Sequence, residues 1–184
     1  MKRLIDIGLS LLALLLLSPV LLATAIAIAL ESGRPVFFSQ VRIGLGGRAF
    51  RMLKFRSMRR DAAAVGPYFT ATDDPRITRS GRFIRRTSID ELPQLINVLK
   101  GDMSLVGPRP DVPAQRGLYT DQDWALRCSV RPGITGLAQA RLRSDATPEQ
   151  RLALDLQYQR EQSVWFDLKI MAWTVGRLSG KGGN

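Results

Sequence analysis

The most informative absence in this sequence is histidine. The chain has 184 residues and no His, which excludes Ser-His-Asp and Cys-His catalysis, zinc sites with His ligands and His general bases. The single cysteine, Cys128, excludes an intrachain disulfide and a thiolate metal cluster, and we assign it to packing. Any chemistry of this chain must therefore use carboxylates, hydroxyls or lysine.

Acidic residues are scarce beside the basic ones. The chain has 27 Lys and Arg against 16 Asp and Glu, a net charge of +11. Most of the basic residues are arginine, whose planar guanidinium suits phosphate groups. Anionic partners are therefore expected. Basic residues beside a membrane segment also simply hold it at the cytoplasmic side, so charge alone identifies no substrate.

Charge is missing altogether from Leu9 to Leu30, a run long enough to reach across or deep into a bilayer. Three interpretations compete for it: a cleaved signal peptide, a spanning helix, and a helix that enters the membrane and turns back. Both flanks are positive, with Lys2 and Arg3 before the run and a series of arginines from Arg34 onwards. The positive-inside rule is met most simply if both ends lie in the cytoplasm.

Ser18-Pro19, near the middle of the run, is the expected apex of such a turn. Proline removes a helix hydrogen bond, and a neighbouring serine hydroxyl can bond to a carbonyl that is left free. Proline also occurs in ordinary spanning helices. The residues alone favour the re-entrant and spanning topologies equally, and the signal peptide less.

The rest of the chain is expected to fold as a mainly helical α+β region. Stretches 36–43 and 49–57 flank a glycine-rich turn at 44–47 and predict a small β-hairpin. In the second arm Lys54 and Arg56 share one face, which we expect to be solvated. A helix with a distorted first turn is expected from Ser88, because Pro93 falls one turn inside it.

Further along, Gly101 is expected to end that helix, and 107–110 and 131–136 to form rigid turns. A short helix is expected at 114–127. Thr147 combines an N-cap, a following proline and a capping-box glutamine, which predicts a helix to about Gln162. In the last helix aromatic and basic groups cluster around Trp165, which slightly favours burial at a membrane interface over burial in the core.

The acidic pair Asp90-Glu91 is the most suggestive candidate site. A structural alternative is a capping box formed by Ser88 and Glu91. In the functional alternative, one carboxylate attacks a phosphoryl group while arginines and a divalent metal neutralise the phosphate charge. Free amides at the helix start would point at the anion, and the helix dipole would lower the carboxylate pKa. Arg109, between two prolines, is a second candidate phosphate ligand.

Several separated motifs carry a resemblance to a known family. They are Lys54-Phe55-Arg56-Ser57-Met58, Thr87-Ser88-Ile89-Asp90-Glu91-Leu92-Pro93-Gln94 and Gly101-Asp102-Met103-Ser104-Leu105-Val106-Gly107-Pro108-Arg109-Pro110. With the Ser18-Pro19 break and Arg131-Pro132-Gly133-Ile134-Thr135-Gly136-Leu137-Ala138-Gln139, the chain resembles the bacterial sugar transferases, which are monotopic phosphoglycosyl transferases. The resemblance covers nearly the whole chain, which is similar to the minimal catalytic form of the family.

The resemblance implies an enzyme of the bacterial inner membrane, monotopic and facing the cytoplasm. Residues 1–32 would form a re-entrant membrane helix turned at Ser18-Pro19. Residues 33–184 would form the catalytic region with interfacial amphipathic helices, and the whole would be one structural unit. The expected partners are a UDP-sugar, polyprenyl (undecaprenyl) phosphate and membrane lipid.

By the same similarity, Asp90 is the nucleophile that takes a phospho-sugar from the UDP-sugar, releasing UMP, and polyprenyl phosphate then accepts it. Glu91 would assist the second step as a base, and Mg²⁺ at Asp90 would offset phosphate charge. In this sequence, the residues that resemble the family's phosphate-binding positions are Arg85, Pro108, Arg109 and Pro110.

Two other classes compete with this interpretation. The positive charge is also typical of a membrane-tethered nucleic-acid-binding protein, but no binding motif is recognisable and we expect no nucleic-acid partner. A membrane-anchored scaffold would use Asp90-Glu91 only to cap a helix. The sequence does not reveal the sugar, and Leu137 stands where related sequences often have Trp. The oligomeric state is equally open, a homo-oligomer included.

Overall fold

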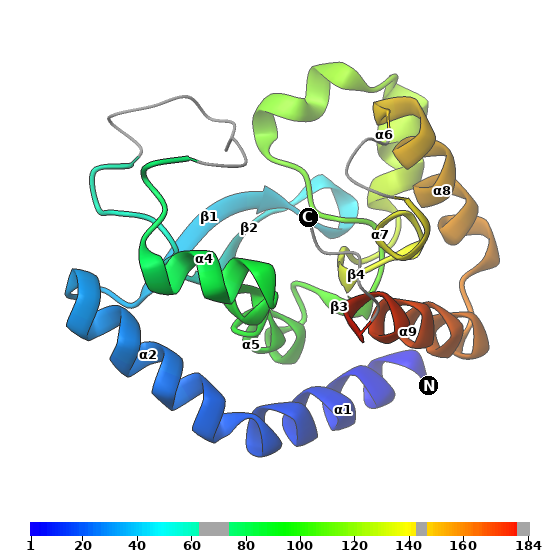
Figure 1. Ribbon diagram of the computed structural model, residues 1–184. Helices are drawn as coiled ribbons and strands as arrows, with labels where there is room; N and C mark the ends of the chain where they lie inside the picture. Colours follow the sequence, from blue (N-terminus) through cyan, green and yellow to red (C-terminus); the bar gives the residue numbers. More distant parts are fainter. Residues whose placement is uncertain (63–73, 143–146, 180–184) are drawn as a thin grey trace.

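The computed structural model describes residues 1–62, 74–142 and 147–179. It is mainly helical, with two small two-stranded sheets. Two N-terminal helices form a bent pair along one side of the molecule, and the other elements lie on the inner side of this bend (Figure 1). The expected mainly helical α+β class with a small hairpin is confirmed.

The bent pair consists of α1 (Lys2–Leu16) and α2 (Ser18–Ser32), which meet at 62°. Pro19 lies in the first turn of α2, and the Ser18 hydroxyl donates to the Leu15 carbonyl at 2.8 Å. The expected break at Ser18-Pro19 is therefore confirmed. Within the described residues no single helix has the length and apolar character to cross a membrane, although the bent pair together does.

The outer surface of the pair is apolar and exposed. Its large apolar residues with at least half of their surface exposed are Leu4, Leu11, Leu12, Leu15, Leu16, Leu22, Ile26 and Leu30. The buried side chains of the pair, Asp6, Ser10, Thr24 and Ile28, are mostly polar. This inverts the usual pattern of a soluble surface helix, and apolar exposure on this scale marks a contact with a partner or a membrane.

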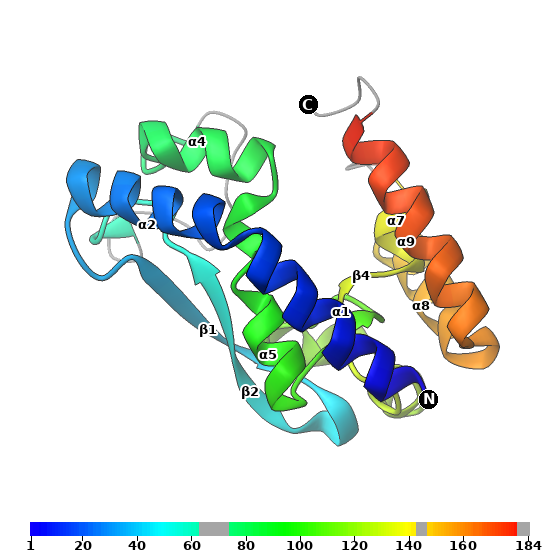
Figure 2. The ribbon, with the colours of Figure 1, turned by 90° about the horizontal axis from the view of Figure 1, so that it is seen from below.

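The first turns of α1 are bonded to the body of the protein. Lys2 Nζ lies 2.5 Å from Asp167 Oδ2. The Asp6 carboxylate accepts from the Ser104 hydroxyl at 2.8 Å and from the Leu105 backbone N–H at 3.2 Å. Seen from below, α1 lies beside α5 and α2 beside α4 (Figure 2).

The far end of α2 is fixed to the same body. The Arg56 guanidinium donates to the Ser32 carbonyl and hydroxyl, at 3.0 and 2.8 Å, which satisfies acceptors that a helix end leaves free. The Glu31 carboxylate accepts the first two backbone N–H groups of α4 (Arg79–Arg86), at 2.7 and 2.9 Å. Arg56 is 7% exposed, so the solvated face expected for Lys54 and Arg56 is wrong.

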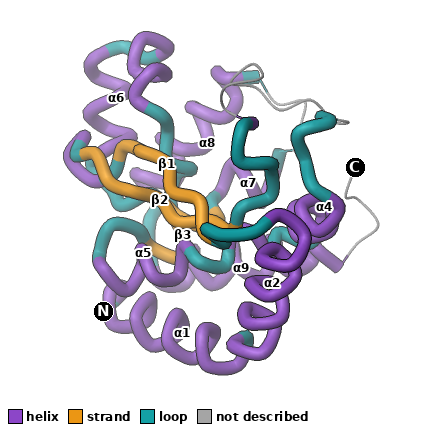
Figure 3. The backbone as a smooth tube through the Cα atoms, turned by 90° about the vertical axis from the view of Figure 1, so that its left-hand side faces the viewer, coloured by secondary structure: helices purple, strands orange, loops and turns teal. Residues whose placement is uncertain are grey.

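The predicted hairpin is confirmed. Strands β1 (Phe37–Ile43) and β2 (Ala49–Phe55) pair antiparallel, with Phe37 opposite Phe55 and Ile43 opposite Ala49 (Figure 3). The 3₁₀ turn η1 (Leu45–Gly47) joins them. The Phe55 side chain packs with Ile28 of α2 and Ile84 of α4 in one buried cluster, so the hairpin, α2 and α4 share a core.

Helix α4 precedes the acidic pair and was not predicted. Four of its residues are arginines, but Thr78 caps it by accepting from the Gly81 N–H at 2.9 Å, and Ile84 is buried. The helix expected from Ser88 is instead a 3₁₀ turn, η2 (Ile89–Glu91), followed by the short α5 (Gln94–Lys100). The distorted start and the end at Gly101 are confirmed.

The turns expected at 107–110 and 131–136 are linked by a second sheet. Strand β3 (Ser104–Val106) pairs parallel with β4 (Gly133–Thr135), so the second stretch is partly strand. A Cβ on Gly133 would lie 2.1 Å from the Gly107 nitrogen, and one on Gly107 2.2 Å from the Arg131 carbonyl oxygen. Glycine is required because the two backbones touch here.

The C-terminal half is helical. The helix expected at 114–127 is two pieces, the 3₁₀ helix η3 (Pro113–Leu118) and α6 (Asp121–Cys128), because Tyr119 and Thr120 are extended and Thr120 caps α6. The short α7 (Leu137–Arg141) follows β4. Helix α8 (Pro148–Glu161) begins with the predicted Thr147 capping box, and α9 (Val164–Ser179) completes the described chain.

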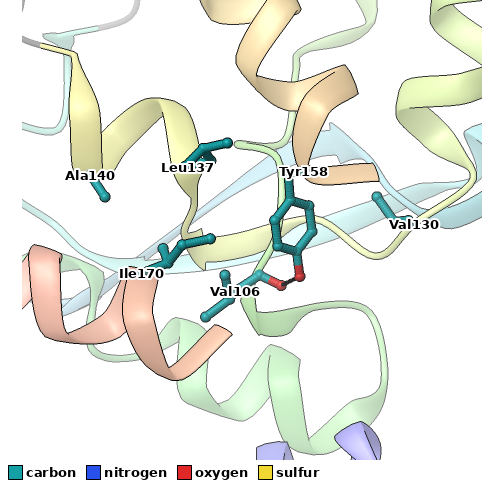
Figure 4. Packing of buried hydrophobic residues seen from close by; sticks show 6 residues of the cluster. All are labelled: Val106, Val130, Leu137, Ala140, Tyr158 and Ile170. Carbon is teal, nitrogen blue, oxygen red and sulfur yellow. Dashed lines mark hydrogen bonds between the residues drawn. The ribbon is translucent and has the colours of Figure 1, made fainter. Parts of the chain in front are cut away.

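The largest core cluster joins these helices to the second sheet. It consists of Val106, Val130, Leu137, Ala140, Tyr158 and Ile170 (Figure 4). Leu137 is 1% exposed, so at this position a leucine fills the core. Helix α9 buries Ile170 here but leaves Trp165 72% exposed, and its burial in a membrane interface stays a prediction. Cys128 is buried, as its assignment to packing requires.

Candidate active site

Asp90 and Glu91 lie together in the turn η2, between α4 and α5. Ser88 has a left-handed backbone (φ 57°) and makes no side-chain cap, so the capping-box alternative is wrong. The N–H groups of Glu91 and Leu92 bond to the carbonyls of Ser88 and Ile89, at 3.2 and 3.1 Å. These two amides are therefore bonded inside the turn, and the expectation that free amides at this point face a bound anion stays a prediction.

The Glu91 carboxylate brings together two cations from distant segments. Its Oε1 accepts from Lys54 Nζ at 2.7 Å and from Arg109 at 2.8 Å. Lys54 comes from β2, and Arg109 from the loop after β3. The structure thus brings together three of the predicted site residues, Asp90, Glu91 and Arg109. Lys54 is a site residue that sequence reasoning missed, although its place in the motif 54–58 was a signal.

The two adjacent carboxylates differ in proton affinity. Burial raises the pKa of Asp90, which is 8% exposed, and the opposing charge of Lys54 does not cancel this effect. Burial also acts on Glu91, but the charges and hydrogen bonds of Arg109 and Lys54 hold its pKa at about 2. The lowered Asp90 pKa expected from a helix start is therefore wrong, because desolvation outweighs the opposing charges of Lys54, Arg85 and Arg109.

The other predicted phosphate ligands are two arginines and the prolines on either side of one of them. The Arg109 side chain is 45% exposed, whereas Pro108 and Pro110 on either side of it are buried. Arg85 lies on α4, half-buried, near enough for its charge to lower the pKa of Asp90. Among the described residues, Arg85 makes no hydrogen bond to either carboxylate. Free donors beside a buried acid suit an incoming phosphate.

Ser18 and Pro19 are not part of this site. Both lie exposed at the junction of α1 and α2. They contribute to the bend between α1 and α2.

The donor set around Asp90 bears on the predicted Mg²⁺. In residues 1–62, 74–142 and 147–179 there is no group of three or more His, Cys, Asp or Glu side chains that could cage a metal. Magnesium, however, keeps several waters and is usually held by one or two carboxylates with substrate phosphates. Within the same residues the Asp90 carboxylate accepts no hydrogen bond, so its oxygens fit such a role.

Known proteins match the chain over nearly its full length. The sequence profile described as bacterial sugar transferase matches residues 1–181. A UDP-glucose:undecaprenyl-phosphate glucose-1-phosphate transferase of Escherichia coli is 47% identical, and the match covers 95% of this chain and 39% of the relative's length. A protein of the same name from Caulobacter vibrioides is 46% identical, with 96% of this chain and 69% of the relative's length covered. An uncharacterized sugar transferase of Bacillus subtilis is 44% identical over 97% and 87%.

The buried charge of Asp90 predicts that Asp90→Asn stabilises the protein at pH 7. A pKa raised by folding means that ionising Asp90 costs folding free energy above the ordinary aspartate pKa of about 4, and costs nothing well below it. The melting temperature should rise at pH 7, and the gain should shrink towards pH 4. For a chain of this length 1 kcal/mol corresponds to about 2–4 °C.

Asp102→Asn is the matched control. Among the described residues the Asp102 side chain, two positions beyond the end of α5, accepts only from Asn97, at 3.1 Å, and asparagine can still accept. It should give no rise. Thermal unfolding in detergent at several pH values measures both variants. A lower melting temperature for Asp90→Asn at pH 7 would contradict the account of a buried charge.

Proposed function

The chain belongs to the bacterial sugar transferase family, and we propose that it transfers a sugar phosphate from a UDP-sugar to polyprenyl phosphate, releasing UMP. The observation that carries the proposal is a buried carboxylate, Asp90, beside a second carboxylate that holds Lys54 and Arg109. A nucleophile and phosphate-binding cations thus occupy one small region.

The proposed substrates are taken from the names of the relatives. The Escherichia coli and Caulobacter vibrioides proteins are both named for glucose-1-phosphate and undecaprenyl phosphate. A Streptococcus agalactiae relative is named a galactosyl transferase. We therefore propose UDP-glucose and undecaprenyl phosphate as the first substrates to test, with UDP-galactose as the alternative donor.

The proposed reaction has two steps at one phosphorus atom. An Asp90 oxygen attacks the β-phosphorus of the UDP-sugar, and the bond from that phosphorus to the bridging oxygen breaks, so UMP leaves with the electron pair. A phosphate oxygen of the polyprenyl phosphate then attacks the same phosphorus and displaces Asp90. The products are polyprenyl-diphosphate-sugar and UMP. Burial that raises the Asp90 pKa also raises its basicity, which favours it as a nucleophile once ionised.

The neighbouring charges have a binding role in this scheme. Lys54 and Arg109 neutralise the phosphates as negative charge develops on the departing UMP. A pKa of about 2 makes the ion-paired Glu91 a weak base. Its proposed role is therefore to hold Lys54 and Arg109 in place. Arg85 supplies further positive charge from α4.

We also propose that Asp90 shares a Mg²⁺ ion with the substrate phosphates. The ion would offset phosphate charge, as it does in other phosphoryl-transfer sites. The chain's part is to present the carboxylate oxygens.

The proposed location is the cytoplasmic face of the bacterial inner membrane, with residues 1–32 re-entrant. Two observations support it. The pair α1–α2 is bent by 62° and exposes apolar side chains on its outer surface. Both of its ends are bonded to the same body, through Lys2 and Asp6 at one end and Glu31 and Ser32 at the other. A spanning segment would have to carry one of these ends to the opposite side.

Membrane topology is measurable by cysteine labelling. In a Cys128→Ala background, one cysteine is placed in an N-terminal extension or at the exposed Arg34 (Arg34→Cys). A re-entrant pair predicts that an impermeant maleimide labels both from the cytoplasmic side only, in inverted vesicles but not in spheroplasts. Labelling of the two positions from opposite sides would refute the re-entrant topology and indicate a spanning helix.

The transfer reaction predicts UMP release from UDP-glucose in the presence of undecaprenyl phosphate and Mg²⁺, and its loss after chelation with EDTA. Asp90→Asn should reduce the rate by at least about 10³-fold, because the amide is not a nucleophile. Asp102→Asn should retain activity. Normal turnover by a folded, membrane-bound Asp90→Asn variant would exclude the proposed chemistry. Retention of nucleic acid without UMP release from either donor would favour a binding protein instead.

A further inference from the structure

The loop that carries Arg109 is held by its backbone along its whole length. Each carbonyl from Pro108 to Asp111 accepts a hydrogen bond from outside the loop, and the donors belong to three segments of the chain, β1, α6 and β4. The donors are the Gly133 N–H to Pro108 (2.9 Å), Arg127 to Arg109 (2.6 Å), Arg42 to Pro110 (2.9 Å) and the Ile43 N–H to Asp111 (2.8 Å). The Arg109 side chain is ion-paired with Glu91.

Arg127 on α6 contributes more to this frame than any one backbone bond. One terminal nitrogen donates to the Arg109 carbonyl at 2.6 Å, and the other donates to the Asp111 carboxylate. Its Nε donates to Asp155 Oδ2 on α8 at 2.9 Å. The side chain is 7% exposed. A single buried guanidinium therefore fixes the loop at Arg109 and at Asp111 and ties both points to α8.

The chemistry of the guanidinium explains why the site uses arginine. Its planar fork presents donors in fixed directions, so three acceptors around it are held at fixed relative positions. A lysine would keep the charge but offer one flexible nitrogen. Burying a charged group costs folding free energy even when it is paired. Here the buried Arg127 guanidinium holds the backbone of Arg109, whose side chain contacts Glu91 in the candidate site.

We propose that Arg127 is a positioning residue, which acts on the transfer reaction by fixing the backbone of Arg109 and so the place of the Arg109 guanidinium beside Glu91 and the substrate phosphates. This inference rests on the proposed function. Misplacing a substrate-binding group by about 1 Å can cost on the order of 100-fold in rate. Arg127 itself touches neither Asp90 nor Glu91 in the described structure.

A double-mutant cycle with Arg109 tests the proposal, using UMP release from UDP-glucose by the full chain in detergent. Arg127→Lys should lower kcat/KM by about 10- to 100-fold. In an Arg109→Ala background the same change should cost less than about threefold, because there is no guanidinium left to position. A merely structural role would cost the same factor in both backgrounds.

Arg177→Lys is the matched control. Arg177 also donates to two backbone carbonyls, those of Gln139 and Leu142, but on α9 and outside the Arg109 loop. Its effect on kcat/KM should be the same with and without Arg109. Equal losses for Arg127→Lys in both backgrounds, with Arg177→Lys behaving in the same way, would overturn the positioning role while leaving the transfer activity intact.

Two further outcomes are decided by the same assay. If Arg127→Lys does not accumulate as folded protein, Asp111→Asn replaces it, since this change removes the ion pair from the loop side, and the same non-additivity with Arg109→Ala is expected. Additive losses for Asp111→Asn would overturn the proposal. If the unchanged protein releases no UMP from any UDP-sugar, the proposed function fails, and the positioning role fails with it.

Discussion

The Glu91 carboxylate accepts from Lys54 at 2.7 Å and from Arg109 at 2.8 Å, and the rest of the candidate site depends on this double ion pair. It joins the hairpin, the turn η2 and the loop after β3, which are far apart in the chain. Without it, two cations and a largely buried carboxylate would lose their partners, which is costly in a partly desolvated place. Both cations are thereby kept next to Asp90.

Asp90 differs from Glu91 in its partners. Glu91 forms ion pairs with both cations, whereas Asp90 is buried and has a raised pKa. Two adjacent carboxylates with opposite pKa shifts are typical of functional sites, where stability is sacrificed for reactivity. The bent helix pair supports this arrangement. Ile28 of α2 packs against Phe55 of β2 and Ile84 of α4, and these two elements also carry Lys54 and Arg85.

Local signals made part of this structure predictable. The proline at Ser18-Pro19, the glycines of the hairpin and the Thr147 capping box act within a few residues, and all three features are present. Helix α4 and the β3–β4 pair depend on distant partners, Glu31 and the contact of Gly107 with Gly133, which no local pattern records. For the same reason strand alternation could place Lys54 on a face but could not reveal that this face meets Glu91.

The central claim is that Asp90 carries the phospho-sugar covalently between the two steps. Intact-protein mass spectrometry tests it most directly, after incubation with UDP-glucose and Mg²⁺ but without polyprenyl phosphate. The account predicts a mass increase of one hexose phosphate, mapped by peptide fragmentation to Asp90 and lost when undecaprenyl phosphate is added. UMP release that requires undecaprenyl phosphate and leaves no adduct, or an adduct on another residue, would contradict it.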